Sequence, residues 1–181
     1  MKFTKTPLKG NYLISLQMIE DERGFFARNY CENEFLAYGL NTKWVQINNS
    51  MSLKSQTLRG LHFQRKPYQE IKLVRCIKGS IFDVVVDLRK NSKTYKKWFG
   101  TLLSDKNRNM MYVPKGCAHG FLSLQAKTEI LYLSSEFYKP SYEEILLWSD
   151  VDIKISWPKK PKVLSEKDCF GRSLKDLEKL L

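Results

Sequence analysis

The feature that most constrains the fold is a succession of short, strand-like runs separated by turn residues. The clearest pair, Lys72–Ile77 and Ile81–Leu88, flanks the glycine-containing turn Lys78-Gly79-Ser80. Two such runs around a short glycine turn predict a β-hairpin. Many short strands at close spacing favour an all-β, closed or double-sheet architecture. Comparable runs lie at 44–51, 57–64, 97–104, 109–113, 118–124 and 128–135.

Two short helices are predicted beside the strands. Residues 31–38 suit a helix that ends near Gly39, and residues 173–181 carry apolar side chains at helical spacing. Ser173 is a suitable N-cap, with Asp176 three positions later. A proline-rich stretch at 157–163 is expected to run over the surface. Since no repeat or linker interrupts the chain, we predict one domain over residues 1–181.

Composition narrows the class of protein. No apolar run approaches the roughly 18 residues of a membrane span, and the lysine-rich start does not resemble a secretory signal. We therefore expect a cytoplasmic protein with no membrane partner. The four cysteines are far apart and form no CxxC pair, which favours reduced, mostly buried thiols over a disulfide framework or structural zinc site. They are Cys31, Cys76, Cys117 and Cys169.

The net charge of +12 raises the question of an anionic partner. The basic residues are scattered along the chain, for example at Lys96-Lys97 and Lys159-Lys160, and no DNA- or RNA-binding motif is present. We therefore expect no nucleic-acid partner. A solvated, lysine-biased surface and a pocket for a small anionic substrate are both compatible with this charge.

The chain has only two histidines, His62 and His119, each in a glycine-flanked, strand-like segment. Histidine is the natural side chain for proton transfer near neutral pH. A site with two histidines and carboxylates binding a metal is an alternative that spacing alone leaves open, although no HxH pair is present. Neither a glycine-rich phosphate loop nor a GxSxG nucleophile motif occurs.

A set of motifs resembles the dTDP-4-dehydrorhamnose 3,5-epimerase family. The motifs follow the order found in the family and cover nearly the whole chain. The resemblance implies a cupin-type jelly-roll β-barrel, usually a homodimer, that needs no metal or organic cofactor. The matching segments are Asp21-Glu-Arg-Gly-Phe-Phe26, Leu58-Arg-Gly-Leu-His-Phe-Gln64, Lys72-Leu-Val-Arg75, Phe82-Asp-Val84, Val86-Asp-Leu-Arg89, Ser92-Lys-Thr-Tyr95, Trp98, Pro114-Lys-Gly116, Ala118-His-Gly-Phe121, Leu131-Tyr132, Trp157-Pro158 and Leu164-Ser-Glu-Lys-Asp168.

The resemblance also implies roles for individual residues. His62 would be the catalytic base paired with Asp168, Tyr132 the proton donor on the opposite face of the sugar, and Lys72 the cation beside the C4 oxygen. The implied reaction inverts C3 and C5 of dTDP-4-dehydro-6-deoxy-D-glucose. Residues implied to hold the nucleotide-linked 4-keto-6-deoxy sugar are Arg23, Gln46, Asn48, Arg59, His119, Glu143 and Lys167.

The chemistry of a 4-keto sugar agrees with these roles. Hydrogens at C3 and C5 are acidic because both carbons adjoin the carbonyl, and their removal gives an enolate with charge on O4. A lysine at O4 stabilises that charge, and a carboxylate on the second nitrogen of His62 fixes its tautomer and raises its basicity. Arginine suits a diphosphate because it binds oxygen pairs bidentately.

One geometric conflict follows from strand periodicity. Arg59 and His62 would point to opposite faces of a regular strand, yet both are wanted in one pocket. Gly60 lies between them, so we predict a bulge or bend there.

The sequence departs from the family pattern at three places. Arg28 stands where relatives often carry an acidic residue that contacts the nucleotide, Ile47 where many have Asp, and Leu133-Ser-Ser135 where a lysine is commoner. A single-centre epimerase, or one acting on a CDP- or GDP-linked 4-keto sugar, is therefore an alternative. A non-catalytic or metal-binding cupin-like module is a third. We also expect the N-terminal region to add to a partner's sheet in the homodimer.

Overall fold

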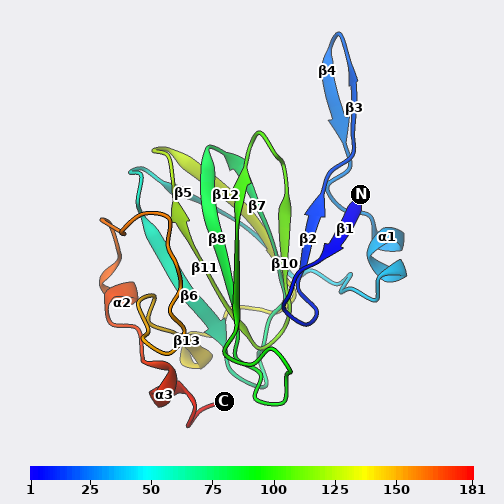
Figure 1. Cartoon of the computed structure of the whole chain (residues 1–181). Coiled ribbons are helices and arrows are strands. Elements are labelled where there is room, and N and C mark those ends of the chain that lie inside the picture. Colours follow the sequence, from blue (N-terminus) through cyan, green and yellow to red (C-terminus); the bar gives the residue numbers. More distant parts are fainter.

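The computed structural model describes residues 1–181 as two facing antiparallel sheets and a separate two-stranded arm (Figure 1). One sheet has six strands in the order β1-β2-β10-β7-β12-β5, and the other has five in the order β13-β6-β11-β8-β9. The strands are β1 (Lys2–Lys5), β2 (Tyr12–Ser15), β3 (Met18–Asp21), β4 (Gly24–Ala27), β5 (Gln46–Ser52), β6 (Leu58–Gln64), β7 (Lys72–Lys78), β8 (Ser80–Asp87), β9 (Trp98–Ser104), β10 (Met110–Val113), β11 (Cys117–Ser123), β12 (Thr128–Ser134) and β13 (Glu143–Ile145).

The main core lies between the two sheets and draws side chains from both. Val74 of β7 and Ile130 of β12 pack with Ile81 and Val85 of β8, all of them almost fully buried. In a jelly roll, two sheets pack face to face so that one face of each sheet is buried. The predicted cupin-type jelly roll is confirmed.

The predicted hairpin around Lys78-Gly79-Ser80 is wrong, although both of its strands exist. β7 pairs with β10 and β12 in the six-stranded sheet, whereas β8 pairs with β9 and β11 in the other. The turn therefore carries the chain from one sheet to the opposite one. Gly79 allows this with φ of +77°, and a Cβ there would lie 2.6 Å from Thr128 Oγ1.

The helices are short. α1 (Glu32–Ala37) confirms the first predicted helix, but the second is reduced to a single turn, α3 (Leu174–Leu177). Ser173 caps α3 as predicted, since its Oγ accepts a hydrogen bond from the Asp176 amide at 3.2 Å. Leu174 and Leu177 are fully buried, while the rest of that segment is more exposed and continues as a turn. α2 (Glu166–Cys169) and a 3₁₀ turn, η1 (Pro140–Tyr142), were not predicted.

None of these helices is long and apolar enough to cross a membrane.

All four cysteines are free thiols, but only two of them are buried. Burial raises the pKa of the Cys76 thiol to about 11 and that of Cys117 to about 12. Cys31 is partly exposed and Cys169 is exposed. The expectation of mostly buried thiols therefore holds for half of the set.

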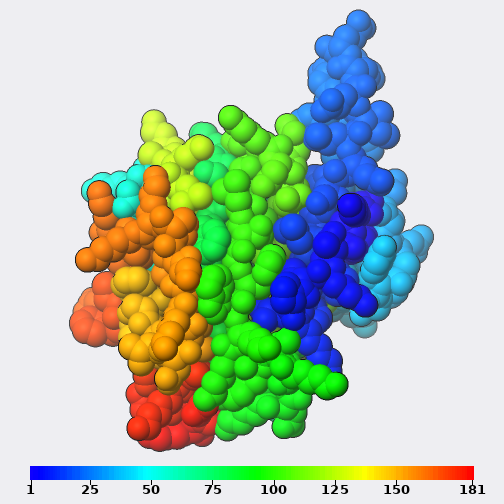
Figure 2. Space-filling view, in the orientation of Figure 1, coloured from blue at the N-terminus to red at the C-terminus, as the bar shows by residue number.

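The hairpin of β3 and β4 projects from the body as an arm (Figure 2). The arm pairs with neither main sheet. Ile19 and Phe26 on it are 70% and 65% exposed, which is unusual for such large apolar side chains. Arg108 lies with its guanidinium 3.9 Å from the ring centre of Phe25, a cation–π contact between the arm and the body.

Candidate active site

A two-lobed cavity opens between the sheets. Its larger lobe has a volume of about 360 Å³ and its smaller lobe about 150 Å³. Both lobes are lined by His62, Lys72 and Tyr132, which therefore mark the junction. His62 comes from β6 in the five-stranded sheet, whereas Lys72 and Tyr132 come from β7 and β12 in the six-stranded sheet. A molecule at the junction thus has the histidine on one side and the lysine and tyrosine on the other.

His62 is held by a buried carboxylate. Its Nε2 lies 2.6 Å from Asp168 Oδ1, and Asp168 is only 4% exposed. Ser165 donates its hydroxyl to Asp168 Oδ2 at 2.8 Å. Burial raises the pKa of Asp168, but hydrogen bonds from His62, Ser165 and Gly60 together outweigh it and hold that pKa below its ordinary value. The ionised Asp168 accepts the Nε2 hydrogen, so Nδ1 of His62 is the nitrogen left to take a proton.

The strand that carries His62 has the irregularity predicted at Gly60. β11 residues His119 and Phe121 are opposite His62 and Arg59, so two steps on β11 match three on β6. Gly60 has φ of +124°, and a Cβ there would lie 2.6 Å from Gly120 Cα. The extra residue turns Arg59 toward the same cavity as His62, because both line the smaller lobe.

The smaller lobe offers a cation without a carboxylate partner. Arg59 donates to the Met51 carbonyl oxygen at 2.9 Å and lies 3.4 Å from the Ser52 hydroxyl. His119 is hydrogen-bonded through Nε2 to Asp83 at 2.8 Å, and Asp83 is fully buried. An anionic group fits this lobe because Arg59 keeps donors that no carboxylate occupies.

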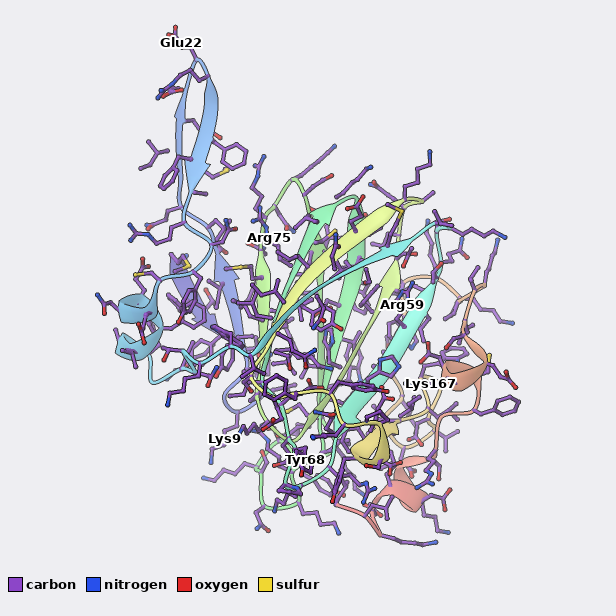
Figure 3. The ribbon with its side chains drawn as sticks, turned by 180° about the vertical axis from the view of Figure 1, so that it is seen from behind. Lys9, Glu22, Arg59, Tyr68, Arg75 and Lys167 are labelled. Carbon is purple, nitrogen blue, oxygen red and sulfur yellow. The ribbon has the colours of Figure 1, made fainter.

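The larger lobe is more polar and holds its charges in pairs. Lys72 Nζ lies 3.0 Å from Glu70 Oε1, and Lys167 forms an ion pair with Glu143. Tyr138 donates its hydroxyl to the same Glu143 oxygen at 2.9 Å. Gln46 and Asn48 line this lobe from alternate positions of the edge strand β5. Figure 3 shows Lys167 and Arg59 on the same side of the molecule, beside β6 and α2.

Tyr138, Gln64 and Glu70 line this lobe but were not among the predicted site residues. Tyr138 lies in the loop after β12, and its amide donates to Gln46 Oε1 at 2.9 Å. Gln64 holds the same loop on both sides of that tyrosine, through the Phe137 carbonyl at 3.2 Å and the Lys139 amide at 2.6 Å. Glu70 lies two positions before Lys72, just outside β7, and this same-face spacing of an extended chain is the one clue that could have placed it in the cavity.

Arg23 does not lie in this chain's own cavity. It is at the turn of the arm, 85% exposed and paired with Asp21. Figure 3 labels its neighbour Glu22 at the arm tip, at the opposite end of the molecule from Lys167. Two of the departures from the family pattern also lie outside: Ile47 is 67% exposed and lines neither lobe, and Arg28 pairs with Glu34 of α1 at 3.3 Å.

No group of three or more histidine, cysteine, aspartate or glutamate side chains lies close enough together to hold a metal ion. The expectation that the site needs no metal stays a prediction, to be tested with a chelator.

Fold and site together define a cupin-type jelly-roll enzyme, with His62 on one wall of its cavity and Lys72 and Tyr132 on the facing wall. Comparison with known proteins identifies the family. Residues 5–176 match the protein-family model described as dTDP-4-dehydrorhamnose 3,5-epimerase. The chain therefore belongs to the dTDP-4-dehydrorhamnose 3,5-epimerase family.

Similar proteins extend over the full length of the chain. The dTDP-4-dehydrorhamnose 3,5-epimerase of Methanothermobacter thermautotrophicus is 46% identical over 97% of this chain and 95% of its own length. The Shigella flexneri enzyme of the same name is 41% identical and covers 98% of each chain. A crystal structure of the Elizabethkingia anophelis enzyme superposes with a TM-score of 0.94 at 42% identity, over 97% of each chain.

Proposed function

We propose that this protein inverts C3 and C5 of dTDP-4-dehydro-6-deoxy-D-glucose, a step toward dTDP-L-rhamnose. The observation that carries the proposal is the placing of His62 and Tyr132 on opposite walls of one cavity, with Lys72 at the same junction. Inversion needs a proton to leave one face of a carbon and another to arrive at the other face. Two acid–base groups on facing walls meet that need.

The first step is proton removal by Nδ1 of His62. The electron pair of the broken C–H bond moves into the ring and places negative charge on O4 of the sugar. Lys72 stabilises this enolate electrostatically. Asp168 supports the imidazolium that forms, because the carboxylate stays bonded to Nε2.

The second step is reprotonation from the other wall. Tyr132 gives its hydroxyl proton to the carbon on the face opposite His62, and the C4 carbonyl forms again. C3 and C5 both adjoin C4, so one oxyanion site serves both inversions. His62 then loses its proton to solvent and Tyr132 regains one, which returns the enzyme to its starting state.

The remaining cavity residues hold the nucleotide. Arg59 and His119 in the smaller lobe suit phosphate oxygens, since Arg59 has no carboxylate partner there. The polar residues of the larger lobe add hydrogen-bond donors and acceptors for the remainder of the substrate. These are Gln46, Asn48, Glu143 and Lys167.

No metal or organic cofactor takes part in this reaction scheme. Lys72 supplies the positive charge at O4, so dialysis against a chelator should leave the rate unchanged. A loss of activity that one added metal restores would overturn this part of the proposal. We place the enzyme in the cytoplasm, because four unpaired thiols suit a reducing compartment.

The working form in this proposal is a homodimer that exchanges its arms. Arg23, Ile19 and Phe26 are exposed on the arm, and β5 leaves one edge of the six-stranded sheet unpaired. An arm that adds to β5 of the partner buries these apolar side chains and brings Arg23 toward the partner's cavity. Unpaired strand edges favour such pairing.

A complementation experiment tests the arm exchange. Co-expression of His62→Asn and Arg23→Ala chains gives mixed dimers. In each mixed dimer one of the two sites is intact, because the Arg23→Ala chain supplies His62 and the arm of the His62→Asn chain supplies Arg23. We expect about a quarter of wild-type activity from two nearly inactive parents. No recovery in mixed dimers, or a monomer by light scattering, would contradict the exchange.

The reaction itself is tested in heavy water with a panel of 4-keto-6-deoxy sugars linked to dTDP, CDP or GDP. The expected result is deuterium at both C3 and C5 of the dTDP-linked sugar, with inversion of both centres. Deuterium at one centre alone identifies a single-centre epimerase. Preference for a CDP- or GDP-linked sugar would reject the proposed nucleotide.

A further inference from the structure

Glu70 is a cavity carboxylate that neither the fold nor the proposed chemistry accounts for. It precedes β7 by two residues and its side chain is only 14% exposed. A carboxylate lining a cavity for an anionic substrate repels that substrate, and its burial costs free energy unless partners compensate. Both of its oxygens have partners inside the cavity, which gives the carboxylate a defined task there.

The two partners are Lys72 and Ser134. Glu70 Oε1 lies 3.0 Å from Lys72 Nζ, and Oε2 accepts a hydrogen bond from the Ser134 hydroxyl at 2.7 Å. Ser134 is opposite Lys72 in the β12–β7 register, so the strand pairing holds the two partners of Glu70 side by side. Lys72 is 12% exposed and forms no other ion pair. The carboxylate is therefore the group that sets the direction of the ammonium.

We propose that Glu70 is a positioning residue that aims the ammonium of Lys72 at the enolate oxygen. A lysine ammonium has three donors on a flexible four-carbon stem. Glu70 takes one of them, which leaves the other two directed into the cavity. Ser134 fixes the carboxylate in turn. This inference rests on the proposed function, in which Lys72 stabilises charge at O4.

Two substitutions distinguish the positioning of the Lys72 ammonium from the effect of the negative charge of Glu70. Glu70→Ala removes the acceptor for Nζ, whereas Glu70→Gln keeps an amide oxygen in the same place and removes only the charge. The amide nitrogen of the glutamine can donate to Ser134, whose hydroxyl already lies 3.1 Å from the Glu136 carbonyl oxygen. The matched control is Glu129→Ala, which removes the partner of Lys78 at 3.7 Å on the same two strands, outside the cavity.

The experiment measures kcat, KM and deuterium exchange in heavy water with the dTDP-linked 4-keto sugar. Misplacement of a catalytic group by about 1 Å costs up to about 10²-fold, so Glu70→Ala should lower kcat by about 10–100-fold. KM should change less than about threefold, because the enolate charge exists only after proton removal. Exchange and inversion should fall together, since both pass through the enolate. Glu70→Gln should retain at least about a third of kcat, and Glu129→Ala should match the wild type.

Three results would overturn the inference: a Glu70→Ala enzyme with unchanged kcat, a rise in KM alone, or a Glu70→Gln enzyme as slow as Glu70→Ala. If Glu70→Ala does not fold, Ser134→Ala tests the inference instead, because it removes the hydroxyl that holds the Glu70 carboxylate. We expect kcat to fall about threefold in that variant. Full activity of Ser134→Ala would contradict the inference. A wild-type enzyme that exchanges no deuterium would instead reject the proposed function.

Discussion

The two histidines of the chain face each other across neighbouring strands, yet their surroundings differ. Each is bonded through Nε2 to an aspartate, His62 to Asp168 at 2.6 Å and His119 to Asp83 at 2.8 Å. The side chain of His62 is 29% exposed, whereas that of His119 is 9% exposed. Asp168 uses both oxygens, while Asp83 Oδ2 is buried with no hydrogen-bond partner.

A histidine–aspartate pair therefore does not by itself define a catalytic base. His62 lies at the junction of both cavity lobes, on the wall opposite Tyr132 and Lys72. His119 lines only the smaller lobe, where it lies beside Arg59. In the proposed reaction His62 removes the proton, because it alone of the two histidines lines both lobes. His119 has the position of a binding group.

The largest expected effect belongs to His62. A positioned general base contributes about 10²–10⁴-fold, so His62→Asn should lower kcat for deuterium exchange by that factor. The fold should survive, because the side chain is partly exposed and asparagine can still donate to Asp168. Circular dichroism and thermal unfolding are the controls. Near-normal exchange in a folded variant would remove His62 from its role.

A smaller effect is expected at His119, and in a different constant. Loss of one hydrogen bond to a charged group costs about 1.5–3 kcal/mol, so His119→Asn should raise KM by about tenfold or more. The value of kcat should stay within about threefold, because phosphate binding is equal in ground and transition states. The same steady-state assay measures both constants. A large loss of kcat with unchanged KM would show that His119 takes part in proton transfer as His62 does.

The sequence predicts eight strands, β5 to β12, because most of them are alternating or β-branched runs bounded by turn residues. It does not predict β1 to β4 and β13, which are only three or four residues long and carry too few residues to show a period. It does not predict which sheet a strand joins, as the turn at Gly79 shows, since a glycine turn can close a hairpin or cross between sheets. The bulge at Gly60 was predictable because Arg59 and His62 conflict with a period of two.

Prediction of the site has the same limit, because motifs name residues but do not place them in space. The resemblance names His62 and Asp168 together, but their contact spans 106 positions and exists only because α2 packs on β6. Glu70 and Tyr138 went unnoticed, because a single acidic or aromatic residue outside a motif has many ordinary explanations. Arg23 lies outside this chain's own cavity, because the arm that carries it projects from the body.

The smallest effect is on stability and concerns Asp168. Its pKa is lowered in the folded protein, so its stabilising contribution is complete above the unfolded value of about 3.9 and is lost as pH falls through the folded pKa. Asp168→Asn should lower the free energy of unfolding by about 1–3 kcal/mol at pH 7. Urea unfolding at several pH values should show this difference shrinking below about pH 4. A difference that is constant in pH would mean that the ionised carboxylate does not stabilise the site.

In the proposed reaction His62 and Tyr132 act on opposite faces of the sugar. Tyr132→Phe separates the two roles, because phenylalanine keeps the ring that packs against the core and removes only the hydroxyl. Deuterium incorporation and the ratio of inverted to retained product are measured together in heavy water, with the dTDP-linked 4-keto sugar. We expect that deuterium still enters the sugar, because His62 and Lys72 remain, but that it returns mostly on the original face with little inverted product. Inversion at close to the wild-type rate would contradict the role of Tyr132 and make water or another side chain the acid.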